Sequence, residues 1–345
     1  MIDLLKLEPT TITRDLKNKF ILLAAPVKYG KTTFMCSIPG ALILSFEPGL
    51  NAHGGVFSQR INTWSELKIV AKQLQKPEVK EKFTTVCFDT IDICAKLCQD
   101  FVCARAGVQS MGEVSFGKLY VEYENEFSKT IREIAMAGYG CIFACHTEEK
   151  STSISEATAK SLPSGMVTKE DGNYYVNKLQ PKLDKRAFGI INGLVDIIGI
   201  GVMDFDEKGE QHRYLYTSET PTVFAGNRFT YFPPKIEFSY DAVLNSLTDA
   251  IEKEGANTGT KIVDKAAVET VEKLDFKALR AEAQDLWTKL VGKGTPDNPM
   301  DEQAATEILK KIEIQMGRKA KLSEITEDQV DILNLIVMDM REMTK

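Results

Sequence analysis

The stretch that decides the fold is an apolar run followed by a glycine, a lysine and two hydroxyl residues: Leu22-Leu23-Ala24-Ala25-Pro26-Val27-Lys28-Tyr29-Gly30-Lys31-Thr32-Thr33. Residues 20–24 have the composition of a buried strand, and residues 33–37 continue as a helix. In a phosphate-binding loop, backbone amides and a lysine meet an anion at such a turn, and a hydroxyl binds Mg²⁺. We therefore predict that the nine residues from Ala25 to Thr33 bind a nucleotide.

The loop departs from the usual G-x-x-x-x-G-K-S/T pattern at one position, because Ala25 replaces the first glycine. A Gly-Lys-Thr tripeptide also arises by chance in ordinary connections between a strand and a helix. The apolar strand before the loop and the helix after it favour the nucleotide site over that alternative.

Composition indicates a globular protein, with 43% hydrophobic and 27% charged residues, and the length of 345 residues favours two domains. No apolar run approaches the roughly 18 residues that span a bilayer, and no secretory signal is evident, so we expect a cytoplasmic protein without a membrane partner. Seven cysteines without a C-x-x-C pair, and only three histidines, favour reduced thiols over a metal site. The net charge of −6 does not exclude nucleic acid, because local basic patches remain possible.

Further buried strands are predicted over residues 41–47, 83–90 and 140–146, with helical segments between them. This alternation is typical of an α/β fold with a mostly parallel central sheet. Ligands of such sheets bind beyond the carboxyl ends of the strands. The polar residues that the sequence places at this edge are Lys31, Thr32, Glu47, Asp89 and His146.

These side chains match the needs of nucleoside triphosphate hydrolysis, which depends mainly on positioning and charge neutralisation. Lys31 would neutralise the phosphates. Thr32 would bind Mg²⁺ directly, and Asp89 would hold it through a bound water. Glu47 would activate the attacking water.

Three further residues complete the predicted site. His146 would sense the γ-phosphate, and Arg228 would neutralise charge on the transferring group, either in its own subunit or in a neighbouring one. Asp92 is interpreted as a helix-capping or supporting carboxylate rather than a metal ligand. The alternatives are a core histidine for His146, an ordinary loop arginine for Arg228 and a plain strand-end acid for Glu47.

The rest of the chain divides into four parts. Residues 147–186 are long and polar, and we interpret them as a loop with space for a short hairpin near residues 174–176. A hairpin over residues 195–217 closes the sheet of the first domain, residues 1–254. Residues 255–263 are predicted to be a linker, and residues 264–345 a small all-helical C-terminal domain.

Five motifs together resemble the phage-encoded RecA-core ATPases that are grouped with Sak-type single-strand annealing and recombination proteins. They are Ala25 to Thr33, Glu47-Pro48-Gly49, Phe88-Asp89-Thr90, Ala144-Cys145-His146 and Gly226-Asn227-Arg228-Phe229. The resemblance covers roughly residues 18–250. It implies a RecA-like P-loop NTPase core, ATP and Mg²⁺ as cofactors, and a homo-oligomeric ring or filament.

The resemblance also implies roles for single residues. RecA-like enzymes place the catalytic glutamate at the end of the strand after the phosphate-loop helix, where Glu47 lies. They read the γ-phosphate from the strand before the second DNA-binding loop, as at His146. Asn227-Arg228-Phe229 is similar to the Lys-Asn-Arg-Phe-Gly motif of bacterial RadA, although Gly226 and Thr230 replace its first and last residues.

In RecA-like proteins the loops after the third and fourth strands face single-stranded DNA, and here they correspond to residues 105–118 and 147–187. Cations with interleaved aromatic residues, such as Tyr174 and Tyr175, suit binding to a single strand without sequence preference. The alternative is a solvated loop whose lysines only maintain solubility. The predicted DNA-binding residues are Arg105, Lys118, Lys178, Lys182, Lys185 and Arg186.

The sequence thus predicts an ATP-hydrolysing protein of DNA recombination or single-strand annealing, in the cytoplasm of an infected bacterial host. Single-stranded DNA is the expected partner, and a single-strand-binding protein is a further one. Two alternatives stay open. One is a DNA helicase, helicase loader or branch-migration ATPase, and the other is a non-hydrolysing, nucleotide-gated scaffold.

Overall fold

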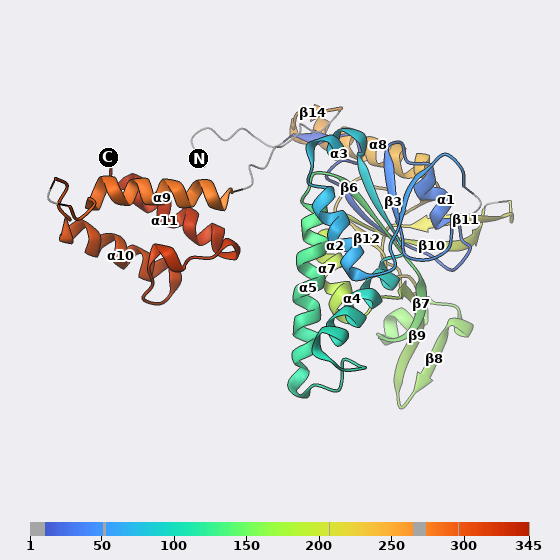
Figure 1. Cartoon of the computed structure of the whole chain (residues 1–345). Helices are drawn as coiled ribbons and strands as arrows, with labels where there is room; N and C mark the ends of the chain where they lie inside the picture. Colours follow the sequence, from blue (N-terminus) through green and yellow to red (C-terminus); the bar gives the residue numbers. More distant parts are fainter. Residues whose placement is uncertain (1–10, 51–52, 207, 265–273, 296, 345) are drawn as a thin grey trace. The chain divides into compact units, whose positions relative to one another are not determined.

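The computed structural model describes residues 11–50, 53–206, 208–264, 274–295 and 297–344 (Figure 1). The chain divides into two compact units, Met1–Val268 and Glu269–Lys345, which are considered separately. Within the described residues, no helix combines the length and the apolar character that crossing a membrane requires.

The first unit is built on a nine-stranded sheet with the order β13-β11-β10-β2-β6-β5-β3-β4, in which β12 also pairs with β10. Neighbours from β10 to β4 run parallel, as predicted for the centre of the sheet. These strands are β2 (Phe20–Ala24), β3 (Ala41–Ser45), β4 (Phe57–Arg60), β5 (Thr85–Asp89), β6 (Gly140–Cys145) and β10 (Ile197–Phe205).

Three antiparallel strands extend the sheet on the far side of β10. They are β11 (Gln211–Tyr216), β12 (Gly226–Asn227) and β13 (Lys235–Glu237). The predicted hairpin of residues 195–217 is therefore confirmed as β10 and β11.

Helices cover both faces of the sheet, which explains why its central strands are continuously apolar. Along β2, Leu22 and Ala24 face one core cluster, whereas Ile21 and Leu23 face the other. The first cluster lies under α2 (Trp64–Gln73), α4 (Ile91–Ala106), α5 (Lys118–Ala135) and α7 (Lys185–Leu194). The second lies under α1 (Lys31–Cys36) and α8 (Tyr240–Thr258).

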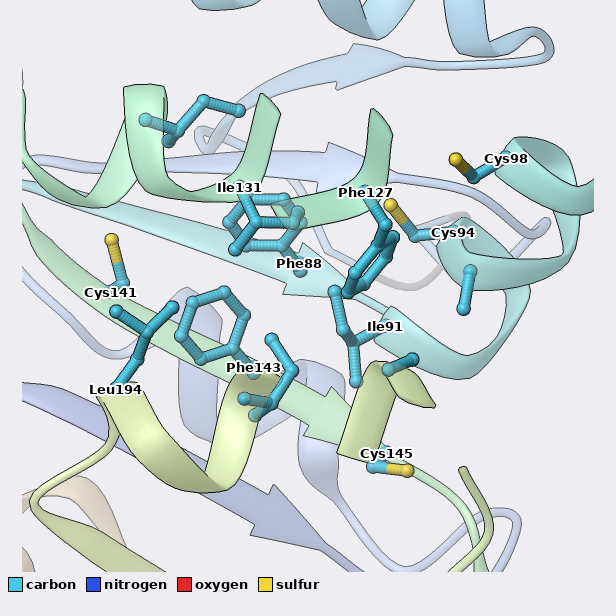
Figure 2. Close-up of a cluster of buried hydrophobic side chains, with 14 of the residues drawn as sticks. Phe88, Ile91, Cys94, Cys98, Phe127, Ile131, Cys141, Phe143, Cys145 and Leu194 are labelled. Carbon is cyan, nitrogen blue, oxygen red and sulfur yellow. The ribbon is translucent and has the colours of Figure 1, made fainter. Parts of the chain in front are cut away.

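The first cluster contains stacked aromatic rings and several thiols (Figure 2). Phe88 of β5 packs against Phe143 of β6, with 4.9 Å between ring centres. All seven cysteines of the chain are free, and six of them are buried. They serve as apolar packing groups, in agreement with the expectation of reduced thiols.

Two short elements between β3 and β5 were not predicted from the sequence. Strand β4 has four exposed residues, so it lacks the apolar run that marks the other parallel strands. Helix α3 (Pro77–Lys82) is a short polar turn after α2. Helix α2 begins with a capping box, since Thr63 and Glu66 each bind the other's backbone amide.

Residues 147–186 do not form the predicted loop. They form an antiparallel sheet of β7 (Thr147–Ile154), β9 (Asn173–Pro181) and β8 (Val167–Glu170), with α6 (Glu156–Ser161) between β7 and β8. In Figure 1 this sheet projects from the core below β6. The β8–β9 turn is Asp171-Gly172, both with positive φ, of 47° and 82°. Asp-Gly is a strong signal for a two-residue hairpin, and the tip of the predicted hairpin lies three residues earlier than we placed it.

The predicted linker, residues 255–263, belongs to the first unit instead. Helix α8 continues through Thr258, with Gly255 buried inside it, and ends at Gly259 in a left-handed conformation. Beyond it, β14 (Ile262–Val263) pairs with β1 (Ile12–Thr13). These glycines end or pack a helix rather than open a flexible connection.

The described residues of the second unit contain three longer helices, α9 (Phe276–Val291), α10 (Glu302–Met316) and α11 (Val330–Glu342), joined by irregular segments with short 3₁₀ turns. They enclose a separate apolar core that includes Leu279, Ile308 and Val337. Asp275 and Asp301 cap the first two helices through their carboxylates.

Candidate nucleotide site

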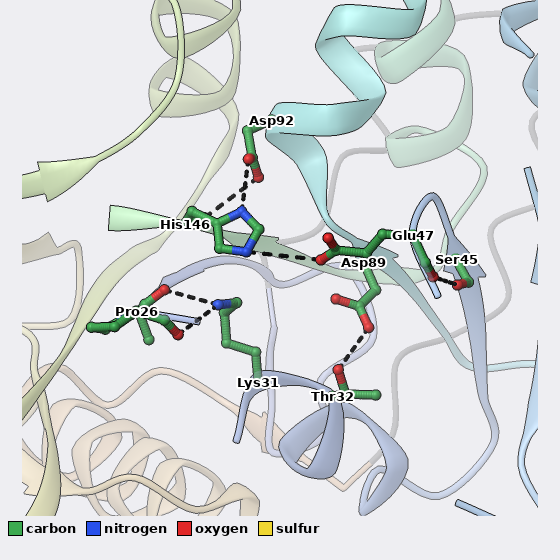
Figure 3. Close-up of polar contacts among 9 residues, drawn as sticks. Pro26, Lys31, Thr32, Ser45, Glu47, Asp89, Asp92 and His146 are labelled. Atoms are coloured by element: carbon green, nitrogen blue, oxygen red, sulfur yellow. Dashed lines mark hydrogen bonds and ion pairs between the residues drawn. The ribbon is translucent and has the colours of Figure 1, made fainter. Parts of the chain in front are cut away.

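The carboxyl ends of β2, β3, β5 and β6 bring five of the predicted site residues together (Figure 3). Lys31 and Thr32 begin the helix after β2, Asp89 ends β5, and Glu47 and His146 follow β3 and β6. Because these strands run parallel, their ends meet at one edge of the sheet.

The loop between β2 and α1 folds over the side chain of its own lysine. The Lys31 ammonium donates hydrogen bonds to the carbonyl oxygens of Ala25, at 2.8 Å, and of Pro26, at 2.9 Å. Its surface is only 6% exposed, and this burial lowers the pKa of Lys31. Above it, Pro26, Val27 and Lys28 are exposed at the crest of the loop. The buried ammonium is thus pre-positioned beneath a turn whose backbone faces solvent.

Ala25 takes the place of a glycine without strain. It is fully buried, its amide donates to the carbonyl of Cys145 at 3.0 Å, and its methyl group packs beside β10. Positive φ angles, which favour glycine, occur in this loop at Lys28 (62°) and Gly30 (110°). The backbone at Ala25 therefore does not require a glycine.

Thr32 and Asp89 form the predicted pair of oxygen ligands. The Thr32 hydroxyl donates to Asp89 Oδ2 at 2.8 Å, and burial raises the pKa of Asp89 despite this hydrogen bond. A Cβ atom on Gly49 would lie 3.7 Å from Thr32 Oγ1 and 3.8 Å from Asp89 Oδ2. Glycine therefore leaves space beside two hard oxygen donors, the ligand type that Mg²⁺ prefers, so these residues fit a bound Mg²⁺ ion.

His146 lies between two carboxylates. Its Nδ1 is 2.8 Å from Asp92 Oδ2, and its Nε2 is 3.8 Å from Glu47 Oε1. The backbone amide of His146 also points to Asp92 Oδ1, at 3.4 Å. Asp92 thereby holds the ring so that Nε2 faces Glu47, a supporting role that agrees with the interpretation from the sequence.

The two carboxylates differ in how readily they take a proton. Burial raises the pKa of the half-buried Glu47, and nearby His146 offsets only part of this effect. Burial also acts to raise the pKa of Asp92, but the hydrogen bond from His146 and its charge outweigh it, and the pKa of Asp92 is lowered. Asp92 is therefore the firmly ionised partner, and Glu47 is the carboxylate with the higher proton affinity.

His146 also connects this edge to the projecting sheet. Strand β7 begins at the next residue, and the amide of Lys182, one residue beyond β9, donates to the His146 carbonyl at 2.7 Å. Both ends of the antiparallel sheet are thus attached at one residue of the candidate site.

Arg228 is not part of this constellation. Its guanidinium contacts Asp196 Oδ1 at 3.2 Å and the Gly193 carbonyl at 3.1 Å. Asp196 in turn accepts a hydrogen bond from the amide of Phe20, the first residue of β2. These contacts place Arg228 at the amino ends of β2 and β10, the opposite edge of the sheet, so it does not reach the candidate site of its own chain. A role for Arg228 in the site of a neighbouring subunit stays a prediction.

Three of the six predicted DNA-binding residues are neutralised by carboxylates. Arg105 pairs with Glu122 and Glu126, whereas Lys178 pairs with Glu219 and Arg186 with Glu124. Contact of these three residues with DNA stays a prediction, and it would compete with their ion pairs. The other three, Lys118, Lys182 and Lys185, are all exposed, and of these only Lys182 lies outside a helix.

The sequence reasoning missed one cation beside the loop. Arg213 of β11 is exposed, and its Nη1 lies 3.4 Å from the position that a Cβ on Gly30 would take. Nothing in the local pattern of β11 distinguishes this arginine. It approaches the loop only because the β10–β11 hairpin folds beside β2.

Two comparisons agree with this geometry. The model of a family described as "AAA domain" matches residues 17–229, more than half of the chain and all of the edge described above. The chain is also 26% identical, over 353 residues, to the SPbeta prophage-derived uncharacterized protein YorG of Bacillus subtilis (strain 168), covering 99% of this chain and 98% of that protein. The chain therefore belongs to the AAA-domain family of P-loop ATPases.

Proposed function

We propose that this protein is a phage ATPase that hydrolyses ATP with Mg²⁺ and couples hydrolysis to binding of single-stranded DNA in recombination or strand annealing. The observation that carries the proposal is the single polar edge, where the Thr32–Asp89 pair lies beside Glu47 and His146. Relationship to a prophage protein supports the phage setting. Assembly into a homo-oligomeric ring or filament is part of the same proposal.

The phosphate end of the site would work by charge. The loop, whose residues 26–28 are exposed, and the Lys31 ammonium would bind the β- and γ-phosphates. Thr32 and Asp89 hold Mg²⁺, which when bound neutralises charge on the phosphate oxygens. Lys31 is surrounded by three carboxylates, namely Glu47, Asp89 and Asp92. The negatively charged phosphates of ATP would therefore need the additional positive charge of Mg²⁺ to bind here.

The hydrolytic step would rest on Glu47. A carboxylate with a raised pKa can accept a proton from water as it attacks, and burial gives Glu47 that property. His146 Nε2 faces Glu47 Oε1 and would orient this carboxylate, while Asp92 holds the imidazole ring through Nδ1. The residue after Asp89 is Thr90 rather than an acid. The proposed catalytic carboxylate, Glu47, therefore comes from the end of the neighbouring strand, β3, and this arrangement supports a RecA-like core.

The DNA end of the proposal rests on the sheet of β7, β8 and β9. Lys150 and Lys169 are exposed on it, and Lys169 lies 5.0 Å from the ring centre of Tyr174. Ammonium groups beside aromatic rings suit a single strand, whose backbone is charged and whose bases stack. The bond from Lys182 to the His146 carbonyl would couple the sheet to hydrolysis.

Binding to single-stranded oligonucleotides tests the DNA proposal. We expect measurable affinity at low salt that falls steeply as salt rises, since phosphate contacts release counterions. Lys182→Ala with Lys185→Ala should weaken binding about tenfold and flatten the salt slope by roughly two. Fluorescence anisotropy measures both, with Lys72→Ala and Lys76→Ala, two exposed lysines near α2, as the matched control. Wild-type protein that binds no single strand at low salt would disprove this part.

Asp92→Ala tests the support of His146. Without the carboxylate the ring loses its fixed orientation, and we expect kcat for ATP to fall about 10- to 100-fold with little change in ATP affinity. Steady-state ATPase assays and a binding titration separate the two effects. Asp100→Ala, at an exposed ion pair on the same helix, is the control. An unchanged kcat would show that Asp92 does not support His146 in hydrolysis.

A further inference from the structure

Arg213 lies beside the nucleotide loop, on a strand that is far from the loop in the sequence. Strand β11 pairs with β10, and β10 pairs with β2, so the hairpin runs alongside the strand that leads into the loop. At Gly201 of β10 an added Cβ would lie 2.8 Å from the Ala25 methyl carbon and 2.7 Å from the Tyr29 ring. Strand and loop are therefore packed against each other as closely as a glycine allows.

Tyr29 fastens the loop to the hairpin. Its side chain is only 5% exposed, and its hydroxyl donates to the carbonyl of Tyr214 at 3.1 Å. Its ring meets that of Phe238 edge-on at 4.7 Å, and the amide of Phe238 donates to the carbonyl of Arg213 at 3.0 Å. Burial raises the pKa of Tyr29 to about 12, so its hydroxyl keeps the proton that it donates. The backbone of Arg213 is thus held in a fixed position relative to the loop.

The guanidinium of Arg213 extends over the residue before Lys31. Its Nη1 lies 3.4 Å from where a Gly30 side chain would begin, and its central carbon lies 5.8 Å from the centre of the Tyr29 ring. Gly30 has a φ of 110°, so a side chain is disfavoured there for conformational reasons as well. The bare backbone at this residue lets the guanidinium come close to the loop.

We propose that Arg213 is a nucleotide-binding residue that contacts the phosphate chain of the nucleotide held by residues 25–33. This inference rests on the proposed function of that loop. Charge favours this contact, because Lys31 stands among three carboxylates and its ammonium is already bonded to the loop. A guanidinium offers a planar set of hydrogen-bond donors to phosphate oxygens. Arg213 is exposed, so its guanidinium can approach a bound phosphate from the solvent side of the loop.

Binding of fluorescent ATP and ADP analogues, each with Mg²⁺, tests the proposal. We expect Arg213→Ala to raise Kd for both nucleotides about tenfold, as for loss of one charge-assisted hydrogen bond. Arg213→Lys should recover part of the affinity, since it restores the charge. Gln211→Ala is the matched control, two residues earlier on the same face of β11 and farther along the hairpin, and it should bind as wild type does.

The outcomes separate the inference from the function on which it rests. Wild-type affinity for ATP in Arg213→Ala, together with loss of affinity in Lys31→Ala, would overturn the role of Arg213 alone. Wild-type protein that binds neither nucleotide would overturn the nucleotide site itself. Should Arg213→Ala fail to fold, as judged by circular dichroism, Arg213→Gln keeps the length and polarity of the side chain and is expected to show the same tenfold loss.

Discussion

Glu47→Gln is expected to lower the rate of ATP hydrolysis about 10²- to 10⁴-fold, with ATP affinity close to that of the wild type. The amide keeps the size of the side chain and its place beside His146, at 3.8 Å, but it cannot accept a proton from the attacking water. Single-turnover hydrolysis and equilibrium binding measure the two quantities separately. Glu78→Gln, at an exposed acid of α3, serves as the control.

The pH dependence gives this prediction a second readout. Hydrolysis requires the ionised form of Glu47, whose pKa is raised by burial, so the wild-type rate should fall as the pH falls through that raised value. The residual activity of Glu47→Gln should lack this acidic limb. Wild-type rates in Glu47→Gln would contradict the assignment. A wild-type protein that binds ATP tightly without turnover would instead favour the nucleotide-gated scaffold.

Lys31→Ala is expected to weaken ATP binding about 100-fold and to abolish measurable turnover at ordinary ATP concentrations. The substitution removes the buried ammonium under the loop and leaves the carbonyls of Ala25 and Pro26 without their donor. The loop loses its buried positive charge and its internal support together.

Isothermal titration with ATP, and steady-state hydrolysis, measure this loss. Lys31→Arg keeps the charge but not the geometry of the two hydrogen bonds, so it should be intermediate in affinity. Lys72→Ala, an exposed lysine of α2, should behave as wild type. Full ATPase activity in Lys31→Ala would refute the nucleotide site.

The central sheet and most of its polar edge were predictable because they follow from local sequence. Parallel strands covered on both faces appear as continuous apolar runs, as in Leu22 and Leu23 of β2, which face opposite cores. Each run ends in a polar residue, and a parallel sheet gathers such ends at one edge. We could therefore predict that Glu47, Asp89 and His146 lie close together without knowing how the side chains pack.

The remaining features depend on contacts between distant segments. The sequence around Arg228 and Arg213 does not show which of them approaches the nucleotide loop. In the structure, Arg228 lies at the amino ends of β2 and β10, and Arg213 lies beside the loop. The ion pair of Arg105 with Glu122 joins α4 to α5, so the charge of a segment says nothing about its partners. Strands β7 and β8 of the projecting sheet are mostly polar, and half or more of their residues are exposed, so they lack the apolar runs that mark the central strands. Asp171-Gly172 marks the turn between β8 and β9.

The projecting sheet is joined to the core at two places. Thr147 and Pro181 pair across its base, so the chain leaves and re-enters the core at points about 5 Å apart. Leu179 of β9 also donates a backbone hydrogen bond to Thr222 and accepts one from Phe224, so the part of β9 nearest the base is tied to the first unit. The outer part of this sheet, beyond Leu179, can therefore diverge between related proteins, while the residues of the candidate nucleotide site stay where β2, β3, β5 and β6 place them.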